Sequence, residues 1–388
     1  MNELYTPFIR TERHKALFMK VEELAKFAKK YSKEMDEQAD FSPEVLNKLK
    51  ESNYVSWPLS LQDGGKELTL YELLLLQERL AVGDGATALS IGWHMNGVME
   101  LRDERMWSDE LYQWLAKEVG TNKKVLNRIA TEPATGSPAR GGRPETTAVK
   151  NGSQYVINGR KTFTSMASVL DYYLVSAYLP EEDGIGWFMI DAKTPGIKVD
   201  PTWNTVGMRG TGSHDLLLSD VSISDKYLVE TGRNKSTTPK GWLMHIPACY
   251  IGIAIAARND AIEFAKNFQP NTLNTPISEV PHIQDKIGQM ELKLLHARSF
   301  MYSVADQWDR YPDQRERLGP SIQAVKTVVT NAATEIVDLA MRIAGGRGLS
   351  KDYQFEKYYR DVRAGLHNPP ADDSVLMNLA KHALNEHE

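Results

Sequence analysis

Residues with the chemistry of cofactor binding and proton transfer gather near the end of this 388-residue chain. A glycine-rich turn comes first and contains Gly345, Gly346 and Gly348. Glycine allows positive φ and close backbone approach, so the turn could admit the phosphates of a nucleotide cofactor, whereas the structural alternative is a helix C-cap. His367 and Asp372 follow, and imidazole and carboxylate groups are common proton carriers in catalysis. An exposed loop histidine and a helix-capping aspartate are their structural alternatives.

Small polar residues at the ends of β-type segments form a second group of candidates in the middle of the chain. The segment IATEPATGS runs from Ile129 to Ser137, and NGRKTFTSMAS starts at Asn158. Such residues are most often turn formers, but their hydroxyl and backbone groups could also hydrogen-bond a planar redox cofactor. His94, in the segment IGWHMNG, is a further candidate, and its structural alternative is a histidine in the core of a buried helix.

Three regions with different periodicity must position these residues. Residues 1–125 show the helical spacing of apolar residues, and residues 236–388 return to it. Between them, residues 126–235 carry short β-type runs separated by Gly, Pro and Asp, with a hairpin signal at Asn151-Gly152. The sequence therefore predicts an α+β fold with an N-terminal all-helical domain, a middle β-barrel or β-sandwich domain and a C-terminal helical bundle.

Composition argues against several classes of function. The net charge of −5 leaves no basic excess to bind nucleic-acid phosphates, and no apolar run reaches the ~18 residues of a membrane span. The N-terminus lacks the apolar core of a signal peptide, so a cytoplasmic location is expected. Cys249, the single cysteine, permits no intrachain disulfide. The nine histidines form no HExxH pair, so no metal site is expected.

The order of these regions, together with their local sequences, resembles the acyl-CoA dehydrogenase family of flavoproteins. The likeness runs over nearly the whole chain and rests on the segments QDGGKELTLYELLLLQERLAVGDGATALSIGWHM, IATEPATGS, YVINGRKTFTSMAS and VGMRGTGSHDLLLSDVSI. It implies helices around a substrate channel in the N-terminal domain, a flavin-binding β-domain and a C-terminal four-helix bundle. The family assembles mainly through that bundle, so a homotetramer is expected.

The resemblance also implies which residues would surround the flavin ring. Ile129, Ala130 and Thr131 occupy the positions that bind the pyrimidine end of the flavin in the family. Phe163 stands where the family usually places a tryptophan against the ring. Ser165 stands where it places a threonine near the redox-active nitrogen.

FAD is the cofactor that the resemblance implies, although its dinucleotide end is less well matched. Ser137 occupies the position that contacts the phosphates, and the turn of Gly345, Gly346 and Gly348 would approach the adenine side. The family grips the pyrophosphate with an arginine and a glutamine from a neighbouring subunit. The corresponding segment here, KNFQPNTLNTPISEVPHIQDKIGQM, is longer and lacks the arginine, which keeps FMN as an alternative.

The catalytic glutamate of the family is missing from this chain. By count along the C-terminal motif its position falls at Pro369, which cannot abstract a proton. In other members the glutamate lies on the first C-terminal helix, and that position falls near Trp242 or Leu243. A positioned general base contributes ~10²–10⁴-fold to the rate, so its absence needs an explanation. Asp372, or Asp373 beside it, is the candidate replacement if the loop takes another path.

Three functions are compatible with these residues. The first is α,β-dehydrogenation of an acyl-CoA thioester, with electrons passed to an electron-transferring flavoprotein, and it leads because it is the usual activity of the family. The second is a flavin-dependent monooxygenase of the same fold, which takes reduced flavin from a separate reductase and uses dioxygen. That branch lacks the glutamate and places histidine and serine near the flavin, as His367, His94 and Ser165 stand here. The third is a flavin-binding scaffold without turnover.

Overall fold

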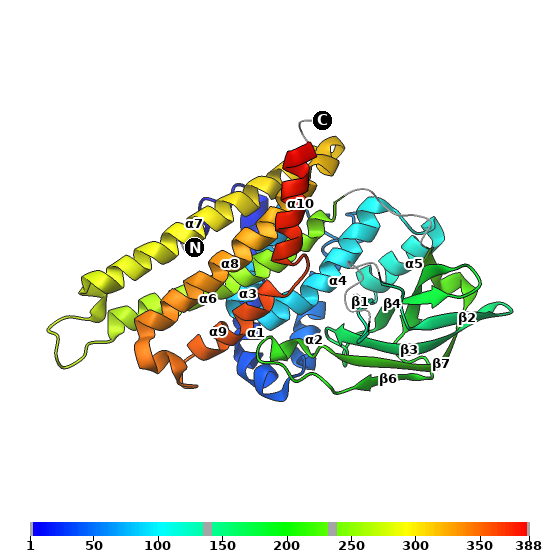
Figure 1. Ribbon diagram of the computed structural model, residues 1–388, viewed down its shortest axis with the longest axis horizontal. Helices are drawn as coiled ribbons and strands as arrows, with labels where there is room; N and C mark the ends of the chain where they lie inside the picture. Colours follow the sequence, from blue (N-terminus) through cyan, green and yellow to red (C-terminus); the bar gives the residue numbers. More distant parts are fainter. Residues whose placement is uncertain (1–2, 135–141, 232–238, 386–388) are drawn as a thin grey trace.

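The structure, a computed structural model, describes residues 3–134, 142–231 and 239–385. The long helices of the C-terminal half lie on one side of the molecule and the strands on the other, with the N-terminal helices between and beneath them (Figure 1). Helices, then one sheet, then helices follow each other along the chain. This order confirms the α+β prediction.

The elements are as follows in the described part of the chain. The α-helices are α1 (Glu12–Gln38), α2 (Pro43–Glu51), α3 (Leu70–Gly83), α4 (Gly85–Glu104), α5 (Asp109–Gly120), α6 (His245–Asn267), α7 (Pro281–Arg310), α8 (Gly319–Ala344), α9 (Phe355–Arg363) and α10 (Asp372–Asn385). The strands are β1 (Leu126–Ile129), β2 (Thr147–Asn151), β3 (Gln154–Thr164), β4 (Tyr172–Leu179), β5 (Gly184–Asp191), β6 (Ile197–Asp200), β7 (His214–Ser224) and β8 (Leu228–Thr231). Short 3-10 helices used below are η1 (Glu3–Tyr5), η2 (Tyr54–Ser56), η4 (Arg209–Thr211), η6 (Gly241–Met244), η9 (Gly345–Leu349) and η10 (Ala364–Leu366).

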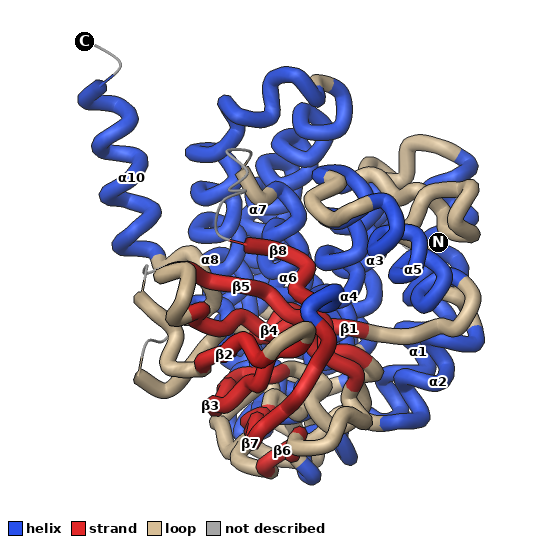
Figure 2. The backbone as a smooth tube through the Cα atoms, turned by 90° about the vertical axis from the view of Figure 1, so that its right-hand side faces the viewer, coloured by secondary structure: helices blue, strands red, loops and turns tan. Residues whose placement is uncertain are grey.

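Helix α4 is the buried helix that packs against the sheet. Asp84 caps its first turn by accepting a hydrogen bond from the Thr87 backbone N–H at 2.7 Å. From Gly85 to Leu101, every residue except Trp93 is buried. A helix that is buried on all sides belongs to the interior, so small and apolar residues fill it. Figure 2 shows α4 beside β1, the strand that carries part of the predicted site.

The sheet is mixed and twisted, with the order β6-β7-β3-β2-β4-β5-β8, and β1 pairs in parallel with β4 off this path. The predicted hairpin at Asn151-Gly152 joins the antiparallel strands β2 and β3. The register between β3 and β7 shifts between Lys161 and Thr164. Such an irregularity bends a strand and re-aims its side chains, and here it falls next to Phe163.

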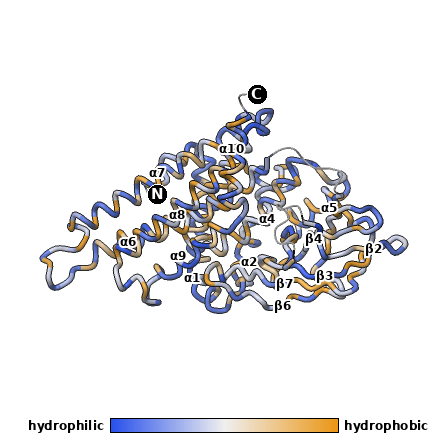
Figure 3. The backbone as a smooth tube through the Cα atoms, viewed as in Figure 1, coloured by the Kyte–Doolittle hydropathy of each residue, from blue (hydrophilic) through white to orange (hydrophobic). Residues whose placement is uncertain are grey.

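The C-terminal half is a bundle built around α6, α7 and α8. The inward face of α8 is formed by buried apolar residues, namely Val325, Val329, Ala333, Ile336, Val337, Ala340 and Ile343. Hydrophobic and hydrophilic residues alternate along α7 and α8, as amphipathic helices require (Figure 3). No helix in the described ranges combines the length and apolarity that a bilayer crossing demands.

Candidate active site

The ends of β1 and β3 meet, and they carry the residues expected around a flavin ring. The Thr162 backbone N–H donates to the Thr131 carbonyl oxygen at 2.9 Å. Residues 129–131 and residues 163–165 therefore lie next to each other. We call these two segments together the β1–β3 seam.

Phe163 is an exposed aromatic residue in a strained backbone conformation. It is 63% exposed, its φ is 56°, and its ring meets Trp203 edge to face with the centroids 5.6 Å apart. A left-handed φ in a bulky residue costs ~1–3 kcal/mol and persists mostly where function requires it. The exposed ring at the seam therefore fits a wall for the flat ring of a flavin.

A chain of three buried hydroxyl groups starts at Ser165. Ser165 Oγ lies 2.9 Å from Ser213 Oγ, which lies 2.8 Å from Thr211 Oγ1. Thr211 donates to the Met208 carbonyl oxygen at 2.9 Å, and a carbonyl only accepts, so each hydroxyl proton in the chain points away from Ser165. Asn127 fixes the same residue by donating to the Ser165 carbonyl oxygen at 3.3 Å. Ser165 Oγ is left as a hydrogen-bond acceptor, which suits the N–H group of a reduced flavin.

The structure gives His94 a structural role. Its Nε2 donates to the Val55 carbonyl oxygen at 2.9 Å, and its Nδ1 accepts from the Leu126 backbone N–H at 3.2 Å. Burial lowers the pKa of His94 to about 4, so the ring is neutral. Both nitrogens are occupied by backbone groups, and no nitrogen is left to exchange a proton with a substrate. We therefore no longer propose His94 as a catalytic residue.

We expect His94 to make the stability of the fold depend on pH. The pKa of His94 in the folded protein, about 4, lies below its ordinary value of 6.5. Between pH 4 and pH 6.5, His94 is therefore protonated more in the unfolded chain than in the folded protein. The free energy of unfolding should therefore be highest above pH 6.5 and fall towards pH 4, by about 3 kcal/mol from this residue. Urea unfolding at pH 7 and pH 4.5 measures this. The His94→Gln variant should show a smaller decline than wild type, and an equal decline would contradict the assignment.

Asp372 is held by α8 instead of standing free as a base. Its carboxylate accepts hydrogen bonds from Asn331 at 2.8 Å, Thr327 at 3.0 Å and Lys326 at 3.2 Å. Partial burial works against ionisation, but the bonds from Asn331 and Lys326 prevail and lower the pKa of Asp372. A carboxylate with a lowered pKa is a weaker base. We therefore no longer propose Asp372 as the replacement for the missing glutamate.

His367 stands in the loop between η10 and α10. It is exposed, and its backbone N–H donates to the Ala364 carbonyl oxygen at 3.0 Å. The next residue, Asn368, accepts a hydrogen bond from the Tyr250 hydroxyl at 2.5 Å, which anchors the loop to α6. Pro369, the position predicted by count for the family glutamate, follows in the same loop. His367 stays a candidate because its imidazole is accessible on an anchored loop.

The glycine turn lies apart from the β1–β3 seam of its own chain. It follows the C-terminal end of α8, on the side of the molecule away from the strands (Figure 1). Gly345 has a φ of 60°, and a Cβ at Gly345 or Gly346 would meet nothing within 4 Å. Gly348 is more enclosed, since a Cβ there would lie 3.3 Å from a backbone oxygen of α8. The open backbone at the first two glycines leaves room for a ligand. Ser137 lies outside the described residues.

A charged cluster beside β1 has no signal in the sequence. Glu100 Oε2 lies 3.4 Å from Arg128 Nε, and Glu100 Oε1 lies 3.4 Å from Lys240 Nζ. Arg128 also binds Glu230 through two hydrogen bonds, at 2.6 and 3.1 Å. Glu100 is 6% exposed, and its Oε2 has no hydrogen-bond partner among the residues that the structure describes. A hollow of about 20 Å³ has Glu100, Lys240 and Trp242 among its lining residues. The alternative position of the family glutamate is predicted, by count, near Trp242 or Leu243.

A second buried polar cluster lies where α3, α4 and α6 cross. A Cβ built at Gly92 would lie 2.3 Å from His245 Nδ1 and 2.9 Å from Gln77 Nε2, so both side chains crowd the same turn of α4. The His245 ring meets Trp93 edge to face at 4.8 Å. Burial lowers the pKa of His245 to about 3. Within the described part of the chain, no hydrogen-bond partner is present for the side-chain amides of Gln77 and Asn96 or for the two ring nitrogens of His245. These groups are suited to bind a neutral polar group of a ligand.

The Arg360-Asp361 pair of the C-terminal motif connects α9 to the loop that leads into η4. Asp361 Oδ1 accepts from the Met208 backbone N–H at 2.6 Å, and Arg360 donates to the Val206 carbonyl oxygen at 3.0 Å. Lys357 lies 2.6 Å from Asp361 and 3.3 Å from Asp84. Met208 also accepts the hydrogen bond that ends the hydroxyl chain from Ser165. The buried cluster is therefore connected to the β1–β3 seam through the Met208 backbone.

The three-part fold and the flavin-fitting seam together define a class, the flavoprotein oxidoreductases of acyl-CoA dehydrogenase architecture. Comparison with known families agrees. The chain matches the N-terminal domain of acyl-CoA dehydrogenases over residues 11–119, the middle domain over 128–221 and the C-terminal domain over 244–366. It belongs to the acyl-CoA dehydrogenase family.

The individual relatives only partly narrow the choice of reaction within this family. YdbM of Bacillus subtilis strain 168, a protein named after the acyl-CoA dehydrogenases, is 45% identical over 377 residues, which are 97% of this chain and 98% of YdbM. Among solved structures, FMN-bound TdsC of Paenibacillus sp. A11-2 has a TM-score of 0.85 at 22% identity, covering 96% of this chain and 98% of TdsC. Butyryl-CoA dehydrogenase of Megasphaera elsdenii has a TM-score of 0.85 at 21% identity, with coverage of 96% and 98%. At these identities the two structures show the fold alone.

Proposed function

We propose that this protein is a flavin-dependent dehydrogenase that oxidises the α,β bond of an acyl-CoA thioester. The observation that carries the proposal is the buried carboxylate of Glu100, which lies on the helix packed against β1 and whose Oε2 accepts no hydrogen bond from the residues that the structure describes. Membership of the family and the identity with YdbM support the type of reaction. By count, the glutamate of the family would fall at Pro369, or near Trp242 or Leu243, none of which can act as a base, so this carboxylate would replace it.

In this proposal, Glu100 accepts the α-proton of the substrate at Oε2. Arg128 and Lys240 each lie 3.4 Å from one of its oxygens, close enough to hold the side chain and too far to occupy it with a short hydrogen bond. Trp242 lines the same hollow and would keep water from the base. When bound, the flavin supplies the acceptor for the β-hydride. Phe163 would support its ring, and Ser165 would accept its N–H.

FAD is the proposed cofactor, with FMN as the alternative. Residues 129–131 would bind its pyrimidine end, and Ser137 stays a prediction for the phosphates.

Because the turn at Gly345 and Gly346 lies apart from the seam of its own chain, it would serve the adenine side of a flavin held by another copy. That arrangement supports the expected homotetramer, and light scattering that finds a monomer would contradict it. An electron-transferring flavoprotein in the cytoplasm is the proposed electron acceptor.

Product analysis tests the reaction directly. The purified protein, with bound flavin and an artificial electron acceptor, should convert a saturated acyl-CoA into the α,β-unsaturated thioester, which chromatography detects. Absence of this product for every chain length, together with a hydroxylated product from reduced flavin and dioxygen, would overturn the proposal. A protein that binds flavin and catalyses neither reaction would be the non-catalytic scaffold.

A monooxygenase of the same fold is the second candidate, and the C-terminal loop favours it. This loop presents Pro369 where the family has its glutamate, and it places the exposed His367 two residues earlier. Imidazole side chains are common proton carriers in catalysis, and the activation of dioxygen requires a proton carrier. Reduced flavin from a separate reductase would then be the co-reactant.

The His367→Ala variant separates the two candidates. If the protein is a monooxygenase, the substitution should abolish oxygenation of the substrate, since the proton carrier is lost. Under the dehydrogenase, acyl-CoA-dependent reduction of the flavin should stay within a factor of ~2 of wild type, because an exposed loop residue contributes little to the rest of the site. Product formation under both conditions measures this, and the Asn368→Ala variant controls for displacement of the loop.

A further inference from the structure

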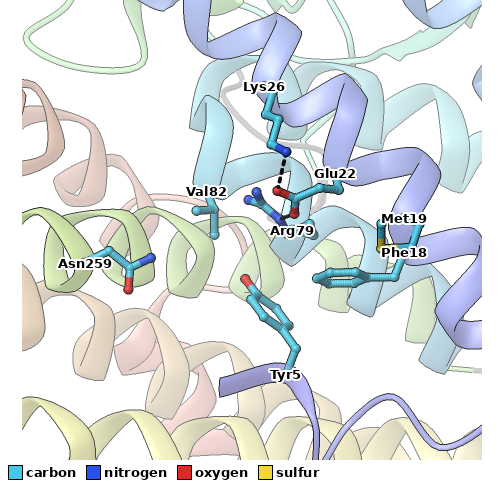
Figure 4. Close-up of a pocket in the computed structure, with 8 residues that line it drawn as sticks. All are labelled: Tyr5, Phe18, Met19, Glu22, Lys26, Arg79, Val82 and Asn259. Atoms are coloured by element: carbon cyan, nitrogen blue, oxygen red, sulfur yellow. Dashed lines mark hydrogen bonds and ion pairs between the residues drawn. The ribbon is translucent and has the colours of Figure 1, made fainter. Parts of the chain in front are cut away.

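A cavity of about 320 Å³ lies between α1, α3 and α6, close to the N-terminal segment (Figure 4). None of its lining residues belongs to the β1–β3 seam. It is lined by Tyr5, Phe18, Met19, Glu22, Lys26, Arg79, Val82 and Asn259. The volume is at the lower end of the range for small-molecule sites, ~300–1,000 Å³.

Two hydrogen-bond donors at this cavity have no hydrogen-bond partner among the residues that the structure describes. Tyr5 is 3% exposed, and its hydroxyl points from η1 into the space between Val82, Arg79 and Asn259 (Figure 4). Within residues 3–134, 142–231 and 239–385, neither the Tyr5 hydroxyl nor Arg79 Nη1 has a hydrogen-bond partner, and both atoms are buried. Leaving a buried polar group unbonded costs ~1–3 kcal/mol, so these donors call for an acceptor from a ligand.

The charges at the cavity favour an anion. Arg79 Nε is bound to Glu22, and Lys26 Nζ lies 3.4 Å from the same carboxylate. Two cations therefore face one carboxylate. Behind Tyr5, Glu78 and Arg298 form a buried pair at 2.8 Å and neutralise each other. The remaining single positive charge matches a ligand with one negative charge.

The other walls are apolar. Phe18 is buried, Val82 is partly buried, and Met19 is 52% exposed beside them. A ligand with an acidic head and a short hydrocarbon chain would satisfy both kinds of wall. We propose that this cavity binds a carboxylate with a short apolar chain, whose oxygens accept hydrogen bonds from Arg79 Nη1 and the Tyr5 hydroxyl. This site is separate from the proposed active site and does not depend on the reaction assigned there.

Calorimetric titration of the purified flavoprotein with octanoate tests the proposal. Wild type should bind octanoate, and Tyr5→Phe and Arg79→Gln should each weaken binding about tenfold, the effect of losing one hydrogen bond to a charged group. Tyr5→Phe keeps the ring and the packing, so it remains informative if Arg79→Gln does not fold. The matched control is Tyr54→Phe, because Tyr54 is also buried, its hydroxyl also has no hydrogen-bond partner in the described part of the chain, and it does not line the cavity. Its affinity for octanoate should equal that of wild type.

Three further titrations, two with other ligands and one with a variant at the seam, test which chemical groups the cavity recognises. Octanol, which lacks the charge, and inorganic phosphate, which lacks the chain, should both bind at least tenfold more weakly than octanoate. Ser165→Ala, at the seam, should leave octanoate binding unchanged. No binding to wild type, equal binding of phosphate or octanol, an effect of Tyr54→Phe as large as that of Tyr5→Phe, or loss of binding in Ser165→Ala would each overturn the proposal.

Discussion

Replacement of Glu100 by glutamine should slow acyl-CoA-dependent reduction of the bound flavin by ~10²–10⁴-fold, the usual contribution of a positioned general base. Glutamine keeps the size of the side chain and one oxygen that can face Arg128 or Lys240, but its amide cannot accept a proton from carbon. Stopped-flow absorbance of the flavin under anaerobic conditions measures the rate. Flavin content and the affinity for a non-reactive acyl-CoA should stay near wild type, because the substitution removes only the base.

Glu230→Gln is the matched control for this experiment. Glu230 binds the other side of Arg128, at 2.6 and 3.1 Å, so its replacement disturbs the same ion cluster without touching the proposed base. Reduction should slow by less than ~10-fold in this variant, as expected for loss of a positioning contact. If both variants are slowed equally, the cluster is structural and Glu100 is not the base.

The second large effect concerns stability, and it comes from replacement of Lys357 by methionine. The Lys357 ammonium group lies between the carboxylates of Asp361, at 2.6 Å, and Asp84, at 3.3 Å, and all three residues are buried. Burial opposes the charge, but the two carboxylates prevail and raise the pKa of Lys357. The variant leaves two buried carboxylates without their cation, which costs ~3–5 kcal/mol of the free energy of unfolding.

Urea unfolding at pH 7 measures this loss, and Lys33→Met is the control. Lys33 is 71% exposed and lies 4.0 Å from Glu37, so its replacement should change the free energy of unfolding by less than ~0.5 kcal/mol. Flavin should also bind more weakly to Lys357→Met, because Asp361 holds the Met208 backbone at the end of the Ser165 hydroxyl chain. A loss below about 1 kcal/mol would show that the cluster relaxes or takes up water.

The helices, strands and turns could be predicted from the sequence because each depends on residues that are close to one another in the chain. The apolar stripe of α8 and the turn at Asn151-Gly152 each depend on residues within a few positions of one another, and the structure shows both. The adjacency of residues 129–131 and 163–165 is also present in the structure. That adjacency was implied by the family resemblance, since no local rule connects two strand ends so far apart in the chain.

The roles of individual polar residues depended on contacts between distant segments. The sequence predicts His94 as a proton carrier, but backbone groups 39 and 32 residues away occupy both of its ring nitrogens. Asp372 was expected as a base, but it is bound by α8 residues 41 to 46 positions earlier. Glu100 was missed because its position beside Arg128 follows only from the packing of α4 on β1. Such pairings follow from tertiary packing, which periodicity and motif spacing do not encode.

The most direct test of the account is an anaerobic titration of the purified flavoprotein with acyl-CoAs of several chain lengths, followed by flavin absorbance. If the protein is an acyl-CoA dehydrogenase, at least one chain length should bleach the oxidised flavin in wild type and in His367→Ala, and bleach it far more slowly in Glu100→Gln. If no acyl-CoA bleaches the flavin, while chemically reduced protein consumes dioxygen and hydroxylates a substrate, dehydrogenation is wrong and the monooxygenase is correct.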